Sequence, residues 1–297
     1  MAIRTQTGVL ALALAAGLAA CSDSGLPTAP TATAASPVES APTAPRVGQP
    51  VNGSVSDSAL RPVAGARVEL LDGPQAGVWT TTDEKGAFVL FGTVDDTTRF
   101  RASKEGLVTA DVTIMPDCER CNPRRWVHFF LNVLDQPAAL AGDYSLMFVA
   151  DPACSNLPPE LRTRTYEATV ALGDFSWWGF PAGAKTSFKV TPKGAAFPGG
   201  LNFFWLNVAG NVVAVVLGDH SDPGVTEQIS DNTYLAFNGW ATVSVEPNVA
   251  TIATPFEGWI DYCVNPNMGE RYNCSPGGVV KLDRCNSSKH QLILTRR

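Results

Sequence analysis

Short apolar segments alternate with polar turns along residues 47–135. Turn signals rich in Asp, Gly and Pro lie between these segments, for example at 72–74 and 83–86. None of the segments follows the 3.6-residue period of an amphipathic helix. The pattern predicts an antiparallel Greek-key β-sandwich of six or seven strands, with strands near 54–55, 66–71, 87–90, 99–102, 108–114 and 126–131.

Residues 138–297 follow a break at Gln136 and Pro137 and alternate more regularly. Eight segments joined mainly by short turns predict an eight-stranded up-and-down β-barrel, which removes its sheet edges by closing on itself. The turn 209–211, Ala-Gly-Asn, is a typical hairpin signal. The whole folded part is therefore predicted to be all-β, with barrel strands near 143–150, 163–172, 185–190, 201–208, 211–217, 233–245, 249–262 and 290–296.

The segment 201–208 is apolar on both of its faces. The interior of an eight-stranded barrel is either a packed core or a dry ligand cavity, and the sequence leaves both open. If it is a cavity, the ligand is a small apolar molecule or a glycan. The predicted ligand-binding side chains are aromatic: Phe203, Trp205, Trp240 and Trp259.

The N-terminus has the pattern of a targeting signal. Residues 9–20 are uncharged and apolar, but 12 residues are too few to span about 30 Å of hydrocarbon as a helix. The run ends in Leu18-Ala19-Ala20-Cys21, which resembles the bacterial lipoprotein signal motif. The resemblance implies that residues 1–20 are removed and that Cys21 is lipidated. The alternative is an ordinary secretory signal beside a chance cysteine.

Lipidation of Cys21 makes the membrane the expected partner and the cell envelope the expected location. Ser22, in place of an Asp after the lipidated cysteine, favours the outer membrane in bacteria with two membranes. Residues 21–46 consist largely of Pro, Ala, Thr and Ser, which predicts an extended tether without a core.

Charge excludes one class of partner. The chain has 22 Lys and Arg against 28 Asp and Glu, a formal net charge of -6. Nucleic-acid affinity depends on basic side chains that neutralise phosphates, so no nucleic-acid partner is expected.

The turns of the first module resemble those of the carboxypeptidase regulatory-like domain. The resemblance rests on four strings, at 53–57, 62–68, 80–88 and 104–106. It implies a transthyretin-like sandwich of the carbohydrate-binding-like fold, in a family that lacks a peptidase site. In these turns Asp83 is expected to cap the backbone, while Gly65 and Gly86 allow tight conformations. The sequence contains no H-x-x-E or H-E-x-x-H zinc-ligand spacing.

The chain has seven cysteines, of which six remain if Cys21 is lipidated. An even number in an exported protein predicts disulfides. Antiparallel closure of the barrel would bring the end of its first strand to the start of its last, which predicts a disulfide between Cys154 and Cys285. The other predicted pairs are local, Cys263 with Cys274 and Cys118 with Cys121; for the latter, redox activity and zinc binding are the less favoured alternatives.

Two further strings resemble known barrels. Gly142 and Tyr144 on the first strand, with Arg296 on the last, resemble the lipocalin and avidin-like pattern, in which a first-strand aromatic residue packs against a cation. Tyr stands here where that group has Trp. Residues 151–166 resemble an uncharacterised barrel module of soil bacterial lipoproteins.

Few residues offer chemistry, and no catalytic residue, metal or cofactor is predicted. The histidines are His128, His220 and His290, and the run Asp219, His220, Ser221, Asp222 has the residue types of a triad but lies on one turn. Glu257 and Asp261 share a strand face at a separation of roughly 13 Å. A calcium cluster of Asp57, Asp72 and Asp83 is less favoured than separate turn carboxylates, and a sugar-stacking role for Trp79 and Trp126 is less favoured than core packing.

The sequence thus favours a non-catalytic, lipid-anchored cell-envelope protein. Its sandwich is expected to serve as a spacer, adhesion or carbohydrate-binding-like module. The alternative is a cell-envelope hydrolase with its site at the barrel mouth, near Asp219 or Tyr272.

Overall fold

The computed structural model describes residues 48–95, 97–113, 126–133, 139–173, 185–198, 202–218, 224–246, 248–265, 274 and 280–297. The chain divides into two units, Met1–Ser40 and Ala41–Arg297, and the described residues all lie in the second. The predicted signal peptide, tether and lipidated Cys21 lie outside the described residues. So do Cys118, Cys121, the run 219–222 and Tyr272.

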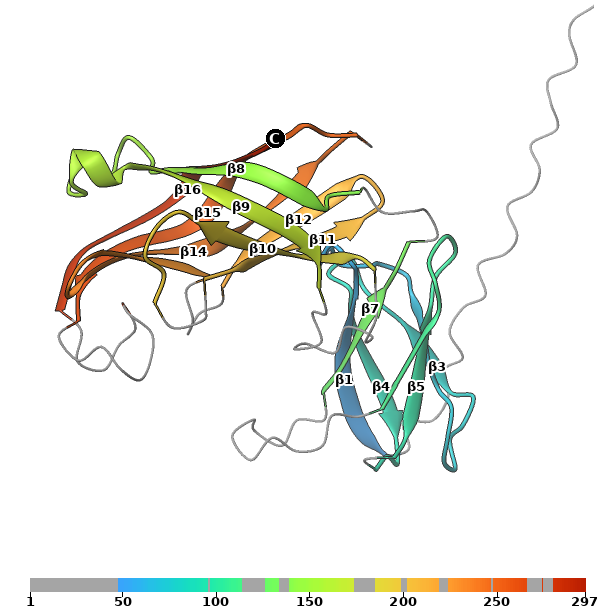
Figure 1. Ribbon diagram of the computed structural model, residues 1–297. Helices are drawn as coiled ribbons and strands as arrows, with labels where there is room; N and C mark the ends of the chain where they lie inside the picture. The colour runs from blue at the N-terminus through green and yellow to red at the C-terminus, as the bar shows by residue number, and fades with distance from the viewer. Residues whose placement is uncertain are drawn as a thin grey trace, which may run out of the picture. The chain divides into compact units, whose positions relative to one another are not determined.

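The first module is a two-layered β-sandwich (Figure 1). One sheet has the strand order β4-β1-β7 and the other β3-β2-β5-β6. Alternate residues of each strand point between the sheets, where Val51, Val68, Phe88, Phe100 and Phe129 are buried in one apolar cluster. The strands are β1 (Gln49–Asp57), β2 (Arg67–Leu70), β3 (Trp79–Thr81), β4 (Ala87–Gly92), β5 (Arg99–Ser103), β6 (Ala110–Thr113) and β7 (Trp126–Leu131).

All six predicted strands of the sandwich are present, and β3 is the seventh. One pairing departs from the antiparallel expectation, because β7 runs parallel to β1. Parallel neighbours require a crossover connection, and here the chain passes through the other sheet between these two strands.

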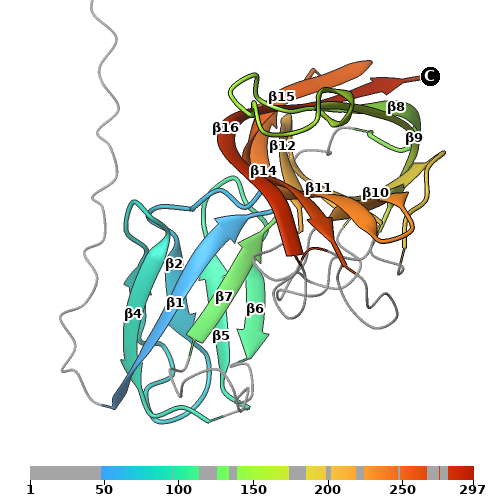
Figure 2. The same cartoon turned by 90° about the vertical axis from the view of Figure 1, so that its left-hand side faces the viewer.

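The second module is a closed eight-stranded antiparallel barrel (Figure 2). Each of the eight predicted segments forms one barrel strand, sequence neighbours pair, and the last strand pairs with the first. The up-and-down prediction is therefore confirmed. The strands are β8 (Gly142–Val149), β9 (Thr163–Leu172), β10 (Ser187–Lys193), β11 (Phe204–Ala209), β12 (Val212–Leu217), β14 (Thr233–Ser244), β15 (Thr251–Val264) and β16 (Val280–Arg296), with a short 3₁₀ turn, η1 (Pro159–Leu161).

A further strand, β13 (Val225–Ser230), does not add a position to the ring. β12 pairs antiparallel with the second half of β14, and β13 pairs antiparallel with its first half. The two are therefore one interrupted strand along β14. Glycines stand at both sides of the interruption, and a Cβ on Gly224 would lie only 2.6 Å from the backbone nitrogen of Gly218.

The last strand is longer than predicted, since β16 begins at Val280 and not near residue 290. Its pairing with β15 shifts register twice, near Gly258 and near Cys263. Such bulges interrupt the regular alternation of a strand, which explains why periodicity alone did not reveal its first half.

Candidate functional site

The described barrel interior is a packed core. Phe148 lies at its centre, stacked on Phe237 with ring centroids 4.3 Å apart. Tyr166, Phe204 and Phe256 surround Phe148 with their rings tilted or edge-on, at centroid distances of 6.2 to 6.3 Å. Of the two interiors that the sequence left open, the structure therefore has the packed one.

The four aromatic residues predicted to bind a ligand lie outside this core, so they do not line the barrel interior. On β11 the inward side chains are Phe204 and Leu206, so Trp205 faces outward, with its ring edge-to-face against Phe203 at 5.8 Å. Trp240 is 59% exposed, and Trp259 lies under the guanidinium of Arg284 at 4.9 Å. Side chains alternate between faces with a period of two, so residues one position from the core point away from it.

One ion pair lies on the inner side of the barrel, between two strands that are not neighbours in the sheet. Glu227 on β13 is buried and accepts hydrogen bonds from both Nε and Nη2 of Arg164 on β9. The hydroxyl of Tyr166 also donates to Glu227, at 2.7 Å. Desolvation, reinforced by the nearby carboxylate, raises the pKa of Tyr166. Because both carboxylate oxygens are engaged, the group connects β9 to β13 and is not a free acid or base.

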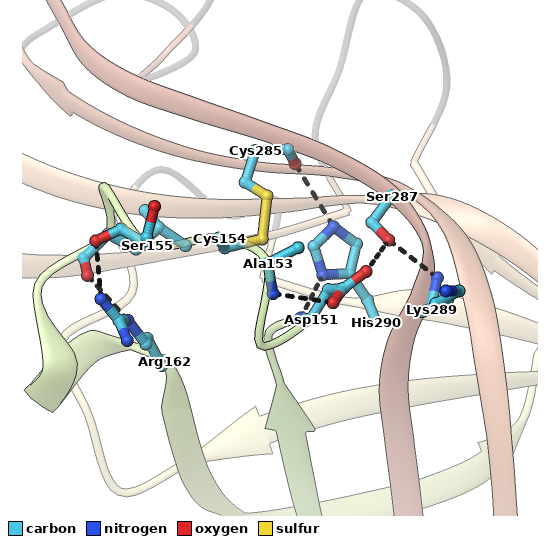
Figure 3. The surroundings of a disulfide bond; sticks show 10 residues. Asp151, Ala153, Cys154, Ser155, Arg162, Cys285, Ser287, Lys289 and His290 are labelled. Atoms are coloured by element: carbon cyan, nitrogen blue, oxygen red, sulfur yellow. Dashed lines mark hydrogen bonds between the residues drawn. A yellow bond between two sulfur atoms is a disulfide. The ribbon is translucent and has the colours of Figure 1, made fainter.

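A disulfide lies where the barrel closes (Figure 3). It joins Cys154, in the loop after β8, to Cys285 on β16, the pair predicted from the strand order. A second disulfide joins Cys263 on β15 to Cys274. The predicted Cys118–Cys121 pair lies outside the described residues.

His290 is buried beside the first disulfide (Figure 3). Its Nδ1 accepts a hydrogen bond from the backbone N–H of Asp151 at 3.1 Å, so Nε2 carries the proton, facing the carbonyl of Cys285 at 3.3 Å. Burial lowers the pKa of His290. The ring is therefore neutral and bridges two backbone segments.

Asp151, Ser287 and His290 have the residue types of a catalytic triad, but their contacts differ from it. The Ser287 hydroxyl donates to the carboxylate of Asp151, and both ring nitrogens of His290 are engaged with backbone. A nucleophile needs its hydroxyl on the base, so this arrangement is structural. Sequence reasoning missed it because Asp151 lies 136 residues from Ser287.

The carboxylates considered for calcium are apart. Asp57 pairs with Arg61 at 2.7 Å, and Asp72 pairs with Arg99 at 3.0 Å. Asp83 accepts from the backbone N–H groups of Lys85 and Ala87, as expected for a turn cap. Among the described residues, the potential metal ligands that gather are Cys154, Cys285 and His290, of which the cysteines are already joined.

The two carboxylates considered for glycoside chemistry, Glu257 and Asp261, lie in different environments. Glu257 is exposed on the outer side of β15, whereas Asp261 is buried in an ion pair with Arg284, whose Nε lies 2.5 Å from its Oδ1. A buried carboxylate that is neutralised by a cation does not supply the general acid of a glycosidase.

The sandwich carries an open depression of about 500 Å³. Its described lining includes Asn52 on β1, Val89 on β4 and Trp126 on β7, together with Thr81 and Asp83. Trp126 is 49% exposed and Val89 is 47% exposed. The preference for core packing is therefore wrong for Trp126, whereas Trp79 is only partly exposed and lies under the guanidinium of Arg67 at 4.3 Å.

Barrel closure uses the first- and last-strand residues that the sequence singled out. Arg296 donates to the hydroxyl of Tyr144 and to the carbonyl of Ala139, and its guanidinium lies 5.4 Å from the Tyr144 ring. The Tyr144 hydroxyl in turn donates to the carbonyl of Leu140 at 2.8 Å.

One comparison with known protein families matches part of the sandwich. Residues 50–117 match the carboxypeptidase regulatory-like domain. The match supports the resemblance seen in the turn strings, and it ends before β7, so Trp126 lies outside the matched range. No curated protein matches the chain. None of the helices in the described part of the chain has the length and apolar character needed to cross a membrane.

Proposed function

We propose that this protein is a non-catalytic, lipid-anchored protein of the bacterial cell envelope. The carboxypeptidase regulatory-like domain would serve as a spacer or adhesion module, and the barrel, lipocalin-like in architecture, would form a rigid body without an internal ligand. Lipidation of Cys21 provides the anchor, and Ser22 directs the protein to the outer membrane. A carboxypeptidase regulatory-like domain and a β-barrel both fit a non-catalytic protein.

One observation carries the non-catalytic part of this proposal. The buried Asp, Glu and His side chains of the described structure are each engaged in an ion pair or in hydrogen bonds: Asp57, Asp151, Glu227, Asp261 and His290. Catalytic acids and bases need a proton-transferring atom that faces a substrate. Side chains held in this way link strands and do not face a substrate.

The anchor is tested by metabolic labelling with a palmitate analogue in a bacterial host. We expect the wild-type chain to be labelled and to fractionate with membranes, and Cys21→Ser to lose both properties. Ser24→Ala is the matched control, since it changes a nearby small residue and leaves the signal motif intact. An unlabelled wild-type chain in the soluble fraction would contradict the anchor.

Sorting is tested by separating inner and outer membranes. We expect Ser22→Asp to move the labelled protein to the inner membrane. The non-catalytic assignment is tested with ester and glycoside substrates. Turnover that disappears in His220→Ala or Glu257→Gln would favour the alternative, a hydrolase at the barrel mouth.

A further inference from the structure

We propose that the outer face of the β4-β1-β7 sheet binds a neutral glycan, with Trp126 as the platform on which a sugar ring stacks. This inference deepens the adhesion role proposed above by naming its ligand class. It does not depend on the lipid anchor.

The strand register places the binding residues in one row. Asn52 of β1 is the direct partner of Val89 on β4 and of Trp126 on β7. Direct partners on neighbouring strands point to the same face, about 4.8 Å apart. The row therefore presents an aliphatic side chain, an amide and an indole side by side on the outer face.

The burial pattern shows that this face is open. Val127 and Phe129 on β7 point inward and are buried, whereas Trp126 is half-exposed. A single exposed apolar side chain needs no explanation, but Trp126 and Val89 are both about half-exposed in one row, which gives a surface on which a partner can stack. The position of Trp126 at the depression identifies the surface at which this partner would bind.

The lining suits a sugar better than a purely apolar ligand. An indole covers the apolar C–H face of a pyranose, and nearby hydrogen-bonding groups are needed for its hydroxyls. Asn52 supplies an amide at this depression. Its volume of about 500 Å³ lies within the range of about 300 to 1,000 Å³ that is usual for small-ligand sites.

The charges favour a neutral glycan. Asp83 is the charged residue among the described lining, and one of its carboxylate oxygens is already occupied by the turn. The chain as a whole is negative, which disfavours an acidic polysaccharide.

The outer face of the other sheet provides an internal comparison. There Arg101 pairs with Asp111 at 2.7 Å, Arg67 with Glu69 at 3.4 Å, and Arg67 also covers Trp79. That face is an array of mutually satisfied charges. The two faces of the sandwich therefore differ, and the Trp126 face is the one suited to stacking.

The test is calorimetric titration of the mature, detergent-solubilised chain with neutral hexasaccharides of glucose and of N-acetylglucosamine in several linkages. We expect at least one of them to bind. Trp126→Ala should weaken that binding roughly 30-fold, as expected for the loss of a central aromatic anchor. Asn52→Ala should weaken it about fivefold.

Trp240→Ala is the matched control, because Trp240 is also exposed, at 59%, but lies on the barrel. We expect its affinity to equal that of the wild type, and all three variants to keep the wild-type melting temperature within a few degrees. Affinity should not change between low and high salt, since no ion pair forms with a neutral ligand.

Three results would overturn the inference: no binding by any hexasaccharide, equal binding by Trp126→Ala and the wild type, or binding that falls steeply with salt. Capture of an apolar extended peptide at Trp126, without sugar binding, would also overturn it. None of these results bears on the palmitate labelling of Cys21, so failure of the glycan site and failure of the anchor are separable.

Discussion

The Cys154–Cys285 disulfide is expected to be the largest single covalent contribution to barrel stability. It connects the loop after β8 to β16, the two neighbours whose pairing closes the ring. The perturbation that tests this is the double replacement Cys154→Ala/Cys285→Ala. The matched control is Cys263→Ala/Cys274→Ala, which removes the second disulfide of the same barrel.

The magnitude follows from the lengths of chain that the two bonds enclose. A disulfide stabilises mainly by limiting the conformations of the unfolded chain, and the effect grows with the logarithm of the loop length. For a separation of 131 residues this gives about 5 kcal/mol. For a separation of 11 residues it gives about 3 kcal/mol.

The assay is urea denaturation of the full mature chain. Trp79 and Trp126 are replaced by Phe in all variants, so that fluorescence reports the barrel tryptophans. We expect both pairs of replacements to lower the free energy of unfolding of the barrel, the Cys154/Cys285 pair by about 2 kcal/mol more than the Cys263/Cys274 pair. The slope of the free energy against urea should also rise, because an uncrosslinked unfolded chain exposes more surface.

Equal losses from the two pairs, or a larger loss from the Cys263/Cys274 pair, would refute the reasoning. Either result would mean that native contacts around the sulfurs outweigh chain entropy. Both cysteines of the control pair are buried, as is Cys154. The packing volume lost on replacement is therefore no larger for the Cys154/Cys285 pair than for the control pair, and it does not by itself predict the larger loss of stability for Cys154/Cys285.

Three further predictions concern burial and backbone geometry. Burial lowers the pKa of His128 from 6.5 to about 4, and it also lowers the pKa of His290. As the pH drops from about 6.5 to about 4, the unfolded chain takes up protons before the folded chain does, so the free energy of unfolding should fall, by about 3 kcal/mol for His128. His128→Gln should flatten this decline in a series of thermal melts. Gly86→Ala should destabilise the sandwich by more than about 1 kcal/mol in urea titrations. The reason is that Gly86 has φ of +71° and that an added Cβ would collide with the carbonyl of Val55. Unchanged stability would contradict this turn geometry. In the same assay, Phe148→Ala should lower the free energy of unfolding by about 4 kcal/mol, because Phe148 is buried at the centre of the barrel. Trp240→Ala should lower it by less than about 1 kcal/mol, because Trp240 is exposed. Similar losses in the two variants would argue against a packed interior.

Local patterns predicted most of the strands and their pairing order. Each of the eight barrel strands overlaps a segment predicted from alternation, although β16 begins at Val280 and not near residue 290. Antiparallel neighbours joined by short turns leave one simple way to close the ring. The same topology brings Cys154 to Cys285, so a pairing across 131 residues followed from strand order. The conformations of Gly65 and Gly86, both at positive φ, followed from turn chemistry.

The groups around the candidate sites were less predictable. Asp151, Ser287 and His290 meet because β16 continues beyond its predicted start and bulges, and a bulge leaves no regular pattern. Glu227 lies on a strand that continues β12 after an interruption, so no sequence neighbour indicates that it faces Arg164. Contacts between distant strands depend on register, which short-range patterns do not contain.

From the sequence, alternation predicted an all-β chain with a sandwich and a meander, which the structure confirms, and Cys21 follows a run that resembles a lipoprotein signal. Which apolar side chains are buried inside became clear only from the folded barrel and sandwich. Alternation divides a strand into two faces, but around Phe204 and Trp205 both faces are apolar, so the sequence pattern does not distinguish the inner face from the outer one. Only closure of the barrel selects the face of Phe204 as the inner one. In the sandwich, likewise, an aromatic residue at the start of β7 could pack or protrude. The register with β1 places Trp126 on the outer face, where solvent and a ligand can reach it.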